Sequence, residues 1–338
     1  MPPSARPALF ALALTQTPSP SPTVHREAYL MGTTLSVSVA APDRAAGIAA
    51  IELAFTAVRH VDDLLSTWRE DSEIARLNHA SPGVPVALSA ELYAMVQEAA
   101  RWSEDTQGAF DPSVGALVDA WDLRGGGRIP SPGRLAAARA ATGMGRFVLS
   151  AVGRDAMRRD SIAWLDTGGF GKGVALRAAE RALRDAGISS AFLNFGGQVL
   201  ALGTDQGDDW IVPVAHPSRR DEEALRLRLR NRSASTSSQS ERWVEVGGRR
   251  LGHVLDPRTG APVPAWGSVT VVAEDPAVAD MVSTALLVLG PEAGERWAKD
   301  RRDVAVLFLI ERDGVVVRHW NRALDPFLLN PSTATRRG

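Results

Sequence analysis

Residues 161–197 read SIAWLDTGGFGKGVALRAAERALRDAGISSAFLNFGG and contain the pattern around which the chain is organised. The first six residues predict a short strand that ends at Asp166, and a glycine-rich loop follows it. Alanines recur at helical contact spacing over 174–186, which predicts a helix that ends at Gly187. Residues 188–197 predict a second strand. The stretch is therefore a strand–loop–helix–strand unit with the glycines at the amino end of the helix.

The loop DTGGFGKG, residues 166–173, has the composition of a phosphate-binding loop, because it combines closely spaced glycines with a lysine. It is not a P-loop, since G-x-x-x-x-G-K-[ST] requires a glycine in place of Asp166 and a hydroxyl in place of Gly173. It is not the dinucleotide motif G-x-G-x-x-G either, because Gly169, Gly171 and Gly173 recur at every second position. A flexible strand-to-helix turn that binds no ligand remains the alternative.

Sequence on both sides of this unit mixes hairpins with strand–helix units and has no fixed-period repeat. Apolar and polar residues alternate over 34–39, which predicts a half-buried strand. Residues 268–274 predict another strand, and an apolar helix over 277–290 follows it and ends on a glycine. Residues 304–320 predict a hairpin with an Asp-Gly turn. These elements predict one α+β unit with a largely antiparallel sheet and packed helices.

Polar residues mark the expected boundaries of further elements. Helices are expected to begin after four N-cap residues, Asp43, Ser72, Ser89 and Ser131. The segment RNRSASTSSQSERW, residues 230–243, is polar and serine-rich, and this composition is typical of a linker.

The bulk composition excludes several functional classes. The chain has 338 residues, of which 45% are hydrophobic and 23% charged, as in folded soluble proteins. A formal net charge of −1 gives no general attraction to nucleic acid or to an anionic membrane, so no nucleic-acid partner is expected. The complete lack of cysteine excludes disulfides, thiolate catalysis and thiolate metal sites.

Residues 1–24 are expected to form a leader or a disordered tail that precedes a folded domain over 25–338. Arg6 precedes a short apolar run, residues 8–14, and a stretch rich in Ser, Pro and Thr follows, as in a secretory leader. A signal peptide here predicts export to the periplasm or cell envelope, whereas an uncleaved tail leaves the protein cytoplasmic. No other stretch approaches the ~18 consecutive apolar residues of a membrane span, so no transmembrane helix is expected.

Asp280 and Thr284 lie four residues apart, on one face of the apolar helix predicted over 277–290. A carboxylate on such a helix is costly unless a positive charge meets it. A hard cation bound by Asp, Thr and backbone oxygens would supply that charge, and magnesium needs neither His nor Cys. The alternative is an ordinary acidic residue near the amino end of a helix.

Three further segments contain candidate functional residues. His253 precedes the Asp-Pro turn of GHVLDPRTGAPV (252–263), and Asp111 stands in a second such turn, GAFDPSVGALV (108–118). In both segments a plain tight turn is the alternative. Trp68 lies at a helix junction, where an indole either covers the core or stacks on a planar ligand.

Seven segments resemble, in sequence order, the FAD:protein FMN transferases, the ApbE-type flavin transferases. They are MGTTLSVSV, LSTW…SEIARLN, GAFDPSVG, DTGGFGKG, NFGGQVLALG, HVLDPRTGAPV and SVTVVAEDPAVADMVSTALLVLG. The resemblance runs from about Met31 to about Trp320. It implies a T-fold-like α+β flavin transferase domain that holds FAD in an extended cleft. With magnesium, such enzymes move the FMN half of FAD onto a Thr or Ser hydroxyl of a target flavoprotein, and AMP leaves.

The resemblance also implies roles for individual residues. Contacts to FAD would come from eight residues, Met31, Trp68, Ala109, Phe110, Asp111, Asp166, Lys172 and His253. Magnesium would be held by the Gly169 carbonyl, Asp280 and Thr284. Lys172 would help neutralise the pyrophosphate, and either Asp280 or His253 would take the proton of the acceptor hydroxyl. Trp68 stands where many members have Tyr, and the usual TSG-x-Y reads TSSQSER at 236–242.

Two other functions fit the same residues. A magnesium-dependent FAD pyrophosphatase would use water in place of the protein hydroxyl and give FMN and AMP. A non-catalytic FAD-binding protein of the envelope is the third reading. Lys172, Asp280 and Thr284 argue against it, because a pure binder need not retain a metal site.

Overall fold

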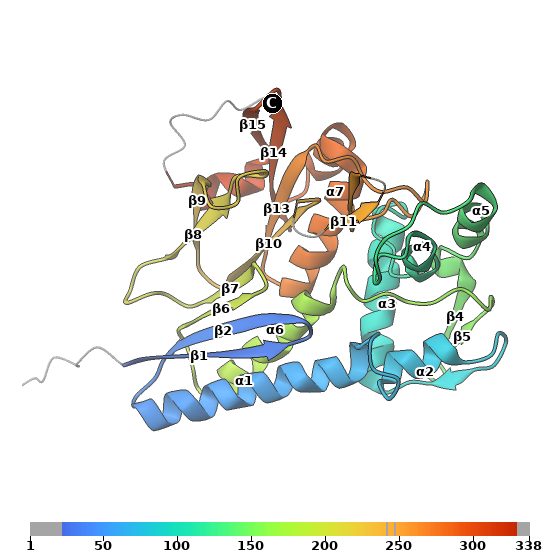
Figure 1. Cartoon of the computed structure of the whole chain (residues 1–338). Helices are drawn as coiled ribbons and strands as arrows, with labels where there is room; N and C mark the ends of the chain where they lie inside the picture. Colours follow the sequence, from blue (N-terminus) through green and yellow to red (C-terminus); the bar gives the residue numbers. More distant parts are fainter. Residues whose placement is uncertain (1–21, 241–242, 247, 330–338) are drawn as a thin grey trace, which may run out of the picture.

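The computed structural model describes residues 22–240, 243–246 and 248–329, and its centre is an eight-stranded sheet (Figure 1). The strand order is β1-β2-β6-β7-β10-β13-β14-β15, and every neighbouring pair is antiparallel. The strands are β1 (Thr23–Leu30), β2 (Thr33–Ala40), β6 (Ala191–Phe195), β7 (Gln198–Leu202), β10 (Arg232–Ser238), β13 (Gly267–Ala273), β14 (Ala305–Arg312) and β15 (Val315–Trp320). The predicted α+β class with an antiparallel sheet is confirmed.

The remaining elements form three small sheets and the helices. The small sheets contain β3 (Val86–Ala87), β5 (Asp155–Arg158) and β4 (Phe147–Ser150); β8 (Trp210–Ala215) and β9 (Glu223–Leu229); and β11 (Trp243–Val246) and β12 (Arg249–Gly252). The helices are α1 (Arg44–Leu65), α2 (Glu73–His79), α3 (Ala90–Asp105), α4 (Gly115–Trp121), α5 (Pro132–Ala140), α6 (Gly171–Asp185) and α7 (Pro276–Ala298). Two 3-10 turns are η1 (Met144–Arg146) and η2 (Arg322–Phe327).

The local signals for helix starts and turns are confirmed. Each of the four predicted N-caps accepts a hydrogen bond from the backbone N–H three residues on, in α1, α2, α3 and α5. Gly290 has φ 75° and ψ 173°, so the helical conformation of α7 breaks at the predicted glycine before a further helical piece. Asp313 and Gly314 both have positive φ, 51° and 76°, in the turn of the β14–β15 hairpin.

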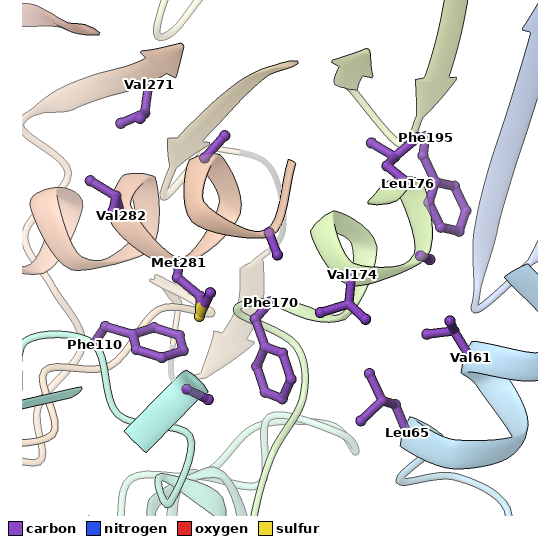
Figure 2. Close-up of a cluster of buried hydrophobic side chains, with 14 of the residues drawn as sticks. Val61, Leu65, Phe110, Phe170, Val174, Leu176, Phe195, Val271, Met281 and Val282 are labelled. Atoms are coloured by element: carbon purple, nitrogen blue, oxygen red, sulfur yellow. The ribbon is translucent and has the colours of Figure 1, made fainter. Parts of the chain in front are cut away.

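Both faces of the large sheet are covered. On one face α1, α6 and α7 pack around a core that includes Phe110 and Phe170 (Figure 2). On the other face the β8–β9 hairpin and η2 cover a second apolar cluster, with Leu227, Leu307 and Leu324 at its centre. Strand β13 is buried along its whole length, and its sequence GSVTVVA includes a buried serine and a buried threonine.

Residues 161–166 were predicted to form a strand, and this prediction is wrong. The segment is extended but pairs with no strand among the described residues. The side chain of Asn78 replaces a strand partner, since its amide donates to the Leu165 carbonyl at 2.9 Å and accepts from the Leu165 N–H at 2.8 Å. The segment still leads directly into the glycine loop, which begins at Asp166.

The linker prediction for residues 230–243 is also wrong. Half of this segment is β10, a central strand between β7 and β13. Ser233, Ser235 and Ser238 are buried there, and their hydroxyls find polar partners within the fold, so their polarity does not require solvent.

The predicted leader, residues 1–24, lies outside the described residues except for its last three positions, and β1 already begins at Thr23. Among the helices that the structure describes, only α7 is long and apolar enough to cross a membrane. Within its apolar window, 61% is buried inside the fold, and Asp280 lies in the same helix.

Candidate functional site

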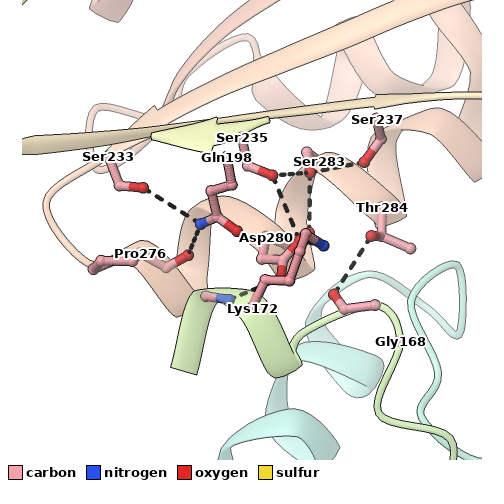
Figure 3. A network of polar contacts seen from close by, with 12 residues as sticks. Gly168, Lys172, Gln198, Ser233, Ser235, Ser237, Pro276, Asp280, Ser283 and Thr284 are labelled. Atoms are coloured by element: carbon pink, nitrogen blue, oxygen red, sulfur yellow. Dashed lines mark hydrogen bonds and ion pairs between the residues drawn. The ribbon is translucent and has the colours of Figure 1, made fainter. Parts of the chain in front are cut away.

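The glycine loop brings the amino ends of α6 and α7 into direct contact. A Cβ atom at Gly173 would lie 2.5 Å from the Pro276 carbonyl oxygen and 2.7 Å from the Ala277 Cα, so only glycine fits there. The close approach lets the Gly173 N–H donate to Asp280 Oδ2 at 2.9 Å (Figure 3). The two helices therefore meet at the carboxylate of Asp280.

Arg177 fixes the same two helices farther along. Its Nε donates to Asp275, the N-cap of α7, at 2.8 Å, and its terminal nitrogens donate to both oxygens of Glu98 on α3 at 2.8 and 2.7 Å. A planar guanidinium that bridges two carboxylates holds three helices in register.

Asp280 is buried, with a relative exposure of 3%, in a polar pocket of the otherwise apolar helix. Lys172 Nζ lies 3.4 Å from Oδ1, and the hydroxyl of Ser235 lies 3.5 Å from the same oxygen (Figure 3). Burial raises the pKa of Asp280, and the charge of Lys172 and the Gly173 N–H oppose that rise. Burial thus outweighs the compensation that these neighbours give the carboxylate.

A chain of serine hydroxyls backs this carboxylate. The Ser283 hydroxyl oxygen lies 3.0 Å from the Asp280 carbonyl oxygen, 3.1 Å from Ser235 Oγ and 2.9 Å from Ser237 Oγ, and its single hydrogen serves one of these contacts at a time. Sequence reasoning missed these residues because it read the segment as a linker. The signal was present, since Ser233, Ser235 and Ser237 alternate with a period of two, as on one face of a strand.

Removing the hydroxyl at the centre of this chain should destabilise the protein. We expect Ser283→Ala to lower the free energy of unfolding by about 1–3 kcal/mol, because buried hydroxyls of Ser235 and Ser237 lose a partner. Urea denaturation measures the change. The exposed Ser81 is the matched control, and Ser81→Ala should shift the midpoint little. Equal effects of the two substitutions would contradict a structural role for the serine chain.

The predicted metal ligands lie together. Thr284 Oγ1 donates to the Gly169 carbonyl at 3.4 Å, and Thr284 follows Asp280 by one helical turn. A Cβ at Gly169 would press on Phe110 and Thr284 at 3.3 and 3.4 Å, so glycine lets the loop approach α7 closely. A carboxylate, a hydroxyl and a carbonyl are hard oxygen donors and fit magnesium. In the part of the chain that the structure describes, no three His, Asp or Glu side chains form an alternative metal cluster.

Met31 and Phe110 lie against the glycine loop, and Ala109 directly precedes Phe110 in the chain. Met31 has φ 48° in the β1–β2 turn, and its Cε lies 3.4 Å from the position of a Cβ at Gly171. Ala109 and Phe110 are buried, and the Phe110 ring meets Phe170 of the loop edge-on with centroids 6.2 Å apart. Met31 therefore contacts the loop from the β1–β2 turn, and Phe110 contacts it from the segment that follows α3.

Asp111 is buried in its turn, where Oδ1 accepts from the Ser113 N–H at 2.8 Å and from the Ser113 hydroxyl at 2.5 Å. Burial raises the pKa of Asp111, against the lowering effect of these hydrogen bonds. The contacts are those of a turn-forming Asp, which was the simpler of the two readings of this segment.

His253 is half-buried and directly follows β12. The segment after it is tied to the end of β10, because the Gln239 amide donates to the Val254 and Val263 carbonyls at 2.7 and 2.8 Å. The Asp-Pro turn after His253 closes through a 2.9 Å ion pair between Asp256 and Arg258.

Asp166 is the first residue of the loop, and both Asp166 and Trp68 contact Arg124. Asp166 Oδ1 accepts from the Gly168 N–H at 2.8 Å, and Oδ2 lies 2.6 Å from a terminal nitrogen of Arg124, which sequence reasoning did not single out. Trp68 has an exposed fraction of 74%, and this excludes the reading that it covers the core.

Comparison with known proteins gives matches over most of the chain. Residues 31–308 match the profile of the ApbE family. The chain is 31% identical over 315 residues to the FAD:protein FMN transferase of Salmonella typhimurium, covering 90% of this chain and 89% of the relative. It is 31% identical over 299 residues to the FAD:protein FMN transferase of Klebsiella pneumoniae, covering 86% of this chain and 85% of the relative.

Solved structures give the same result. The flavin transferase ApbE from Vibrio cholerae superposes with a TM-score of 0.81 at 27% identity, covering 91% of this chain and all (100%) of that one. The ApbE protein from Thermotoga maritima superposes with a TM-score of 0.84 at 27% identity, again covering 91% and 100% of the two chains.

Proposed function

This chain belongs to the ApbE family, and from that premise we propose that it transfers FMN from FAD to a Thr or Ser hydroxyl of a flavoprotein with the help of magnesium. The observation that carries the proposal is the meeting of Asp280, Thr284 and the Gly169 carbonyl beside Lys172. Names of the relatives support the FMN transfer, and the chemistry of these donors supports the metal.

The glycine loop would bind the pyrophosphate of FAD. The Gly171 N–H donates to the Thr167 carbonyl at 2.8 Å and the Gly173 N–H donates to Asp280, so the dipole of α6 and Lys172, rather than these two N–H groups, would attract the anion. Lys172 lies in the first turn of α6 with a side chain 29% exposed, so its ammonium can reach both Asp280 and a phosphate oxygen. When FAD binds, its negatively charged pyrophosphate would become a second partner of the Lys172 ammonium, beside Asp280.

Magnesium would be held by Asp280, Thr284 and the Gly169 carbonyl, and when bound it supplies positive charge to the phosphate oxygens. The chain supplies three oxygens for this purpose, two from side chains on one face of α7 and one from the backbone of the glycine loop. The burial of Asp280 excludes water from most of its carboxylate, which strengthens its interaction with any cation.

In the transfer, the acceptor hydroxyl oxygen forms a bond to the FMN phosphorus, and the bond from that phosphorus to the AMP oxygen breaks. The hydroxyl proton passes to a base, and AMP leaves with the bonding pair. We assign the base to His253 rather than Asp280, because the carboxylate of Asp280 is already engaged with Lys172 and Gly173.

Incubation of the protein with FAD, magnesium and a candidate acceptor flavoprotein tests the function. Flavin fluorescence that stays on the acceptor in a denaturing gel, with an FMN-sized mass added to a Thr or Ser peptide, supports transfer. FMN and AMP in solution without labelled acceptor would indicate the pyrophosphatase. Unchanged FAD would indicate a binding protein.

We expect the protein to bind FAD more tightly than FMN. The loop is assigned to the pyrophosphate, and FMN lacks both the second phosphate and the adenosine. Isothermal titration calorimetry of the two ligands under the same conditions measures the difference. Equal affinities would contradict the assignment of DTGGFGKG to the pyrophosphate.

We also propose export to the periplasm or cell envelope, which rests on the leader-like composition of residues 1–24 alone. Fractionation of cells that express the full chain and a version starting at Pro22 tests it. Loss of the envelope pool only in the shorter version supports a signal peptide.

A further inference from the structure

Trp68, which the family resemblance places at FAD, forms a cluster with Arg124 and Trp164, two residues that the resemblance does not assign. The guanidinium carbon of Arg124 lies over the Trp68 ring at 4.7 Å from its centroid and over the Trp164 ring at 4.4 Å. Both distances are within the ~6 Å range of cation–π contacts. One arginine thus contacts two indole rings at once.

The same guanidinium is held by hydrogen bonds on its edge. Its terminal nitrogens donate to the Thr67 carbonyl at 2.9 Å, to the Thr67 hydroxyl at 2.6 Å and to Asp166 Oδ2 at 2.6 Å. Only a planar guanidinium can stack through its two faces and at the same time donate hydrogen bonds from its edge to two segments of the chain. Arg124 therefore joins the α1–α2 corner, which carries Trp68, to the first residue of the glycine loop.

Two more contacts make this connection rigid. The Thr167 hydroxyl donates to the Leu65 carbonyl at 2.9 Å, which ties the loop to the end of α1. The Trp164 indole N–H donates to Asp119 at 2.8 Å, and its ring lies against Gly115, where a Cβ would come within 2.1 Å of it. Trp164 is thereby a fixed support beneath Arg124.

Trp68 keeps an exposed fraction of 74% although Arg124 contacts its ring. A large aromatic surface that is held still and open to solvent loses little entropy when a ligand ring stacks on it. FAD has two planar rings, and each lies a fixed number of bonds from the pyrophosphate.

We propose that Arg124 is a positioning residue that holds the open surface of Trp68 as a platform for one planar ring of FAD, at a set separation from the pyrophosphate loop. The inference rests on the proposed function, because it takes FAD as the ligand. Arg124 acts through Trp68 and Asp166, and it need not touch the ligand.

The experiment measures FAD, riboflavin and AMP affinities of full-length variants without acceptor protein. Trp68→Ala and Arg124→Met should each weaken FAD binding about fivefold, as expected for one lost stacking contact. The double variant should also lose about fivefold, since both changes remove one platform. Arg124→Lys should behave like Arg124→Met, because lysine keeps the charge and loses the fork.

Riboflavin and AMP identify the ring. The ligand that contains the stacked ring should weaken in parallel with FAD, and the other should keep its affinity. Equal weakening of both would mean general damage to the fold and would overturn the platform. Rescue by Arg124→Lys would also overturn it, because charge alone would then suffice.

Two controls complete the design. Arg128→Met removes an exposed arginine four positions on, which pairs with Asp122 at 3.5 Å, and should leave every affinity unchanged. Ile162→Glu alters a neighbouring cavity of about 470 Å³ that Arg124 and Trp164 also line, and should leave FAD affinity unchanged. A loss with Ile162→Glu and none with Trp68→Ala would place the ring in that cavity and overturn the platform.

The outcomes separate this inference from the proposed function. Wild-type protein that binds FAD but labels no acceptor refutes the transfer, while the variant affinities still decide the platform. Wild-type protein that fails to bind FAD overturns both. Tight FAD binding that Arg124→Met leaves unchanged overturns the platform alone.

Discussion

Asp280→Asn lowers the rate of FMN transfer on the order of 100-fold or more, while FAD affinity measured without magnesium stays nearly the same. The substitution keeps the shape of the side chain and a hydrogen-bond acceptor for the Gly173 N–H. It removes the charge that the cation needs, and loss of one preorganised electrostatic contact has an effect of this size. Transfer rates at several magnesium concentrations measure the change. Near-normal, magnesium-dependent transfer by Asp280→Asn would refute the metal site.

The same substitution has a defined pH signature in stability. Burial raises the pKa of Asp280 above its ordinary value of 3.8, so between that value and the raised one the folded state binds more protons than the unfolded state. Stability contributed by this residue is therefore full below pH 3.8 and is lost as pH rises through the raised pKa. The Asp280→Asn variant has no carboxyl at this position, so it does not lose this stability as the pH rises.

Urea denaturation of the metal-free proteins at several pH values tests the direction of this pH dependence. Relative to wild type, Asp280→Asn should gain stability as the pH rises from about 4 to neutral, because the wild-type carboxyl has its pKa raised above 3.8 in the fold. The opposite trend would mean that Lys172 over-compensates the carboxylate, at a separation of 3.4 Å.

Gly173→Ala lowers the free energy of unfolding by about 1–3 kcal/mol and reduces transfer as well. The added Cβ would meet backbone atoms of Pro276 and Ala277, which cannot rotate away, so α6 and α7 must separate. Separation breaks the Gly173 N–H bond to Asp280 and displaces Lys172 from it. Thermal unfolding and transfer rates together measure the effect.

Gly133 provides the matched control, because it also lies in a helix, α5, and a Cβ there would meet nothing within 4 Å. Gly133→Ala should be neutral or stabilise the protein by up to about 1 kcal/mol, as expected from helix propensity. If both alanines stabilise the protein, the close approach of α6 and α7 has no energetic consequence.

Local features of the fold could be predicted from the sequence because their partners are neighbours in the chain. The N-cap serines and Asp43 bond to N–H groups three residues on, and the Asp313-Gly314 turn needs only its own backbone. The alternating serines of β10 indicated one face of a strand, but the central position of this strand could not be predicted, since Ser235 and Ser237 find their partners on α7, 45 and 46 positions away.

The candidate site shows the same division. The i, i+4 spacing of Asp280 and Thr284 predicted two donors on one helix face, and both lie there in the structure. Arg124 gave no periodic or motif signal, because its partners Thr67 and Asp166 are 57 and 42 positions away. A single sequence does not reveal that three distant segments meet at one guanidinium.

The contact between Lys172 and Asp280 spans 108 positions, and α7 is one of the last helices to leave the ribosome. A nascent chain that ends before α7 has the glycine loop but neither Asp280 nor Thr284. Contacts of such long range form late, after the local hairpins and helices. Under the proposed function, a chain without α7 could not assemble the site for FAD and magnesium, and ligand binding would stabilise only chains in which α7 has docked.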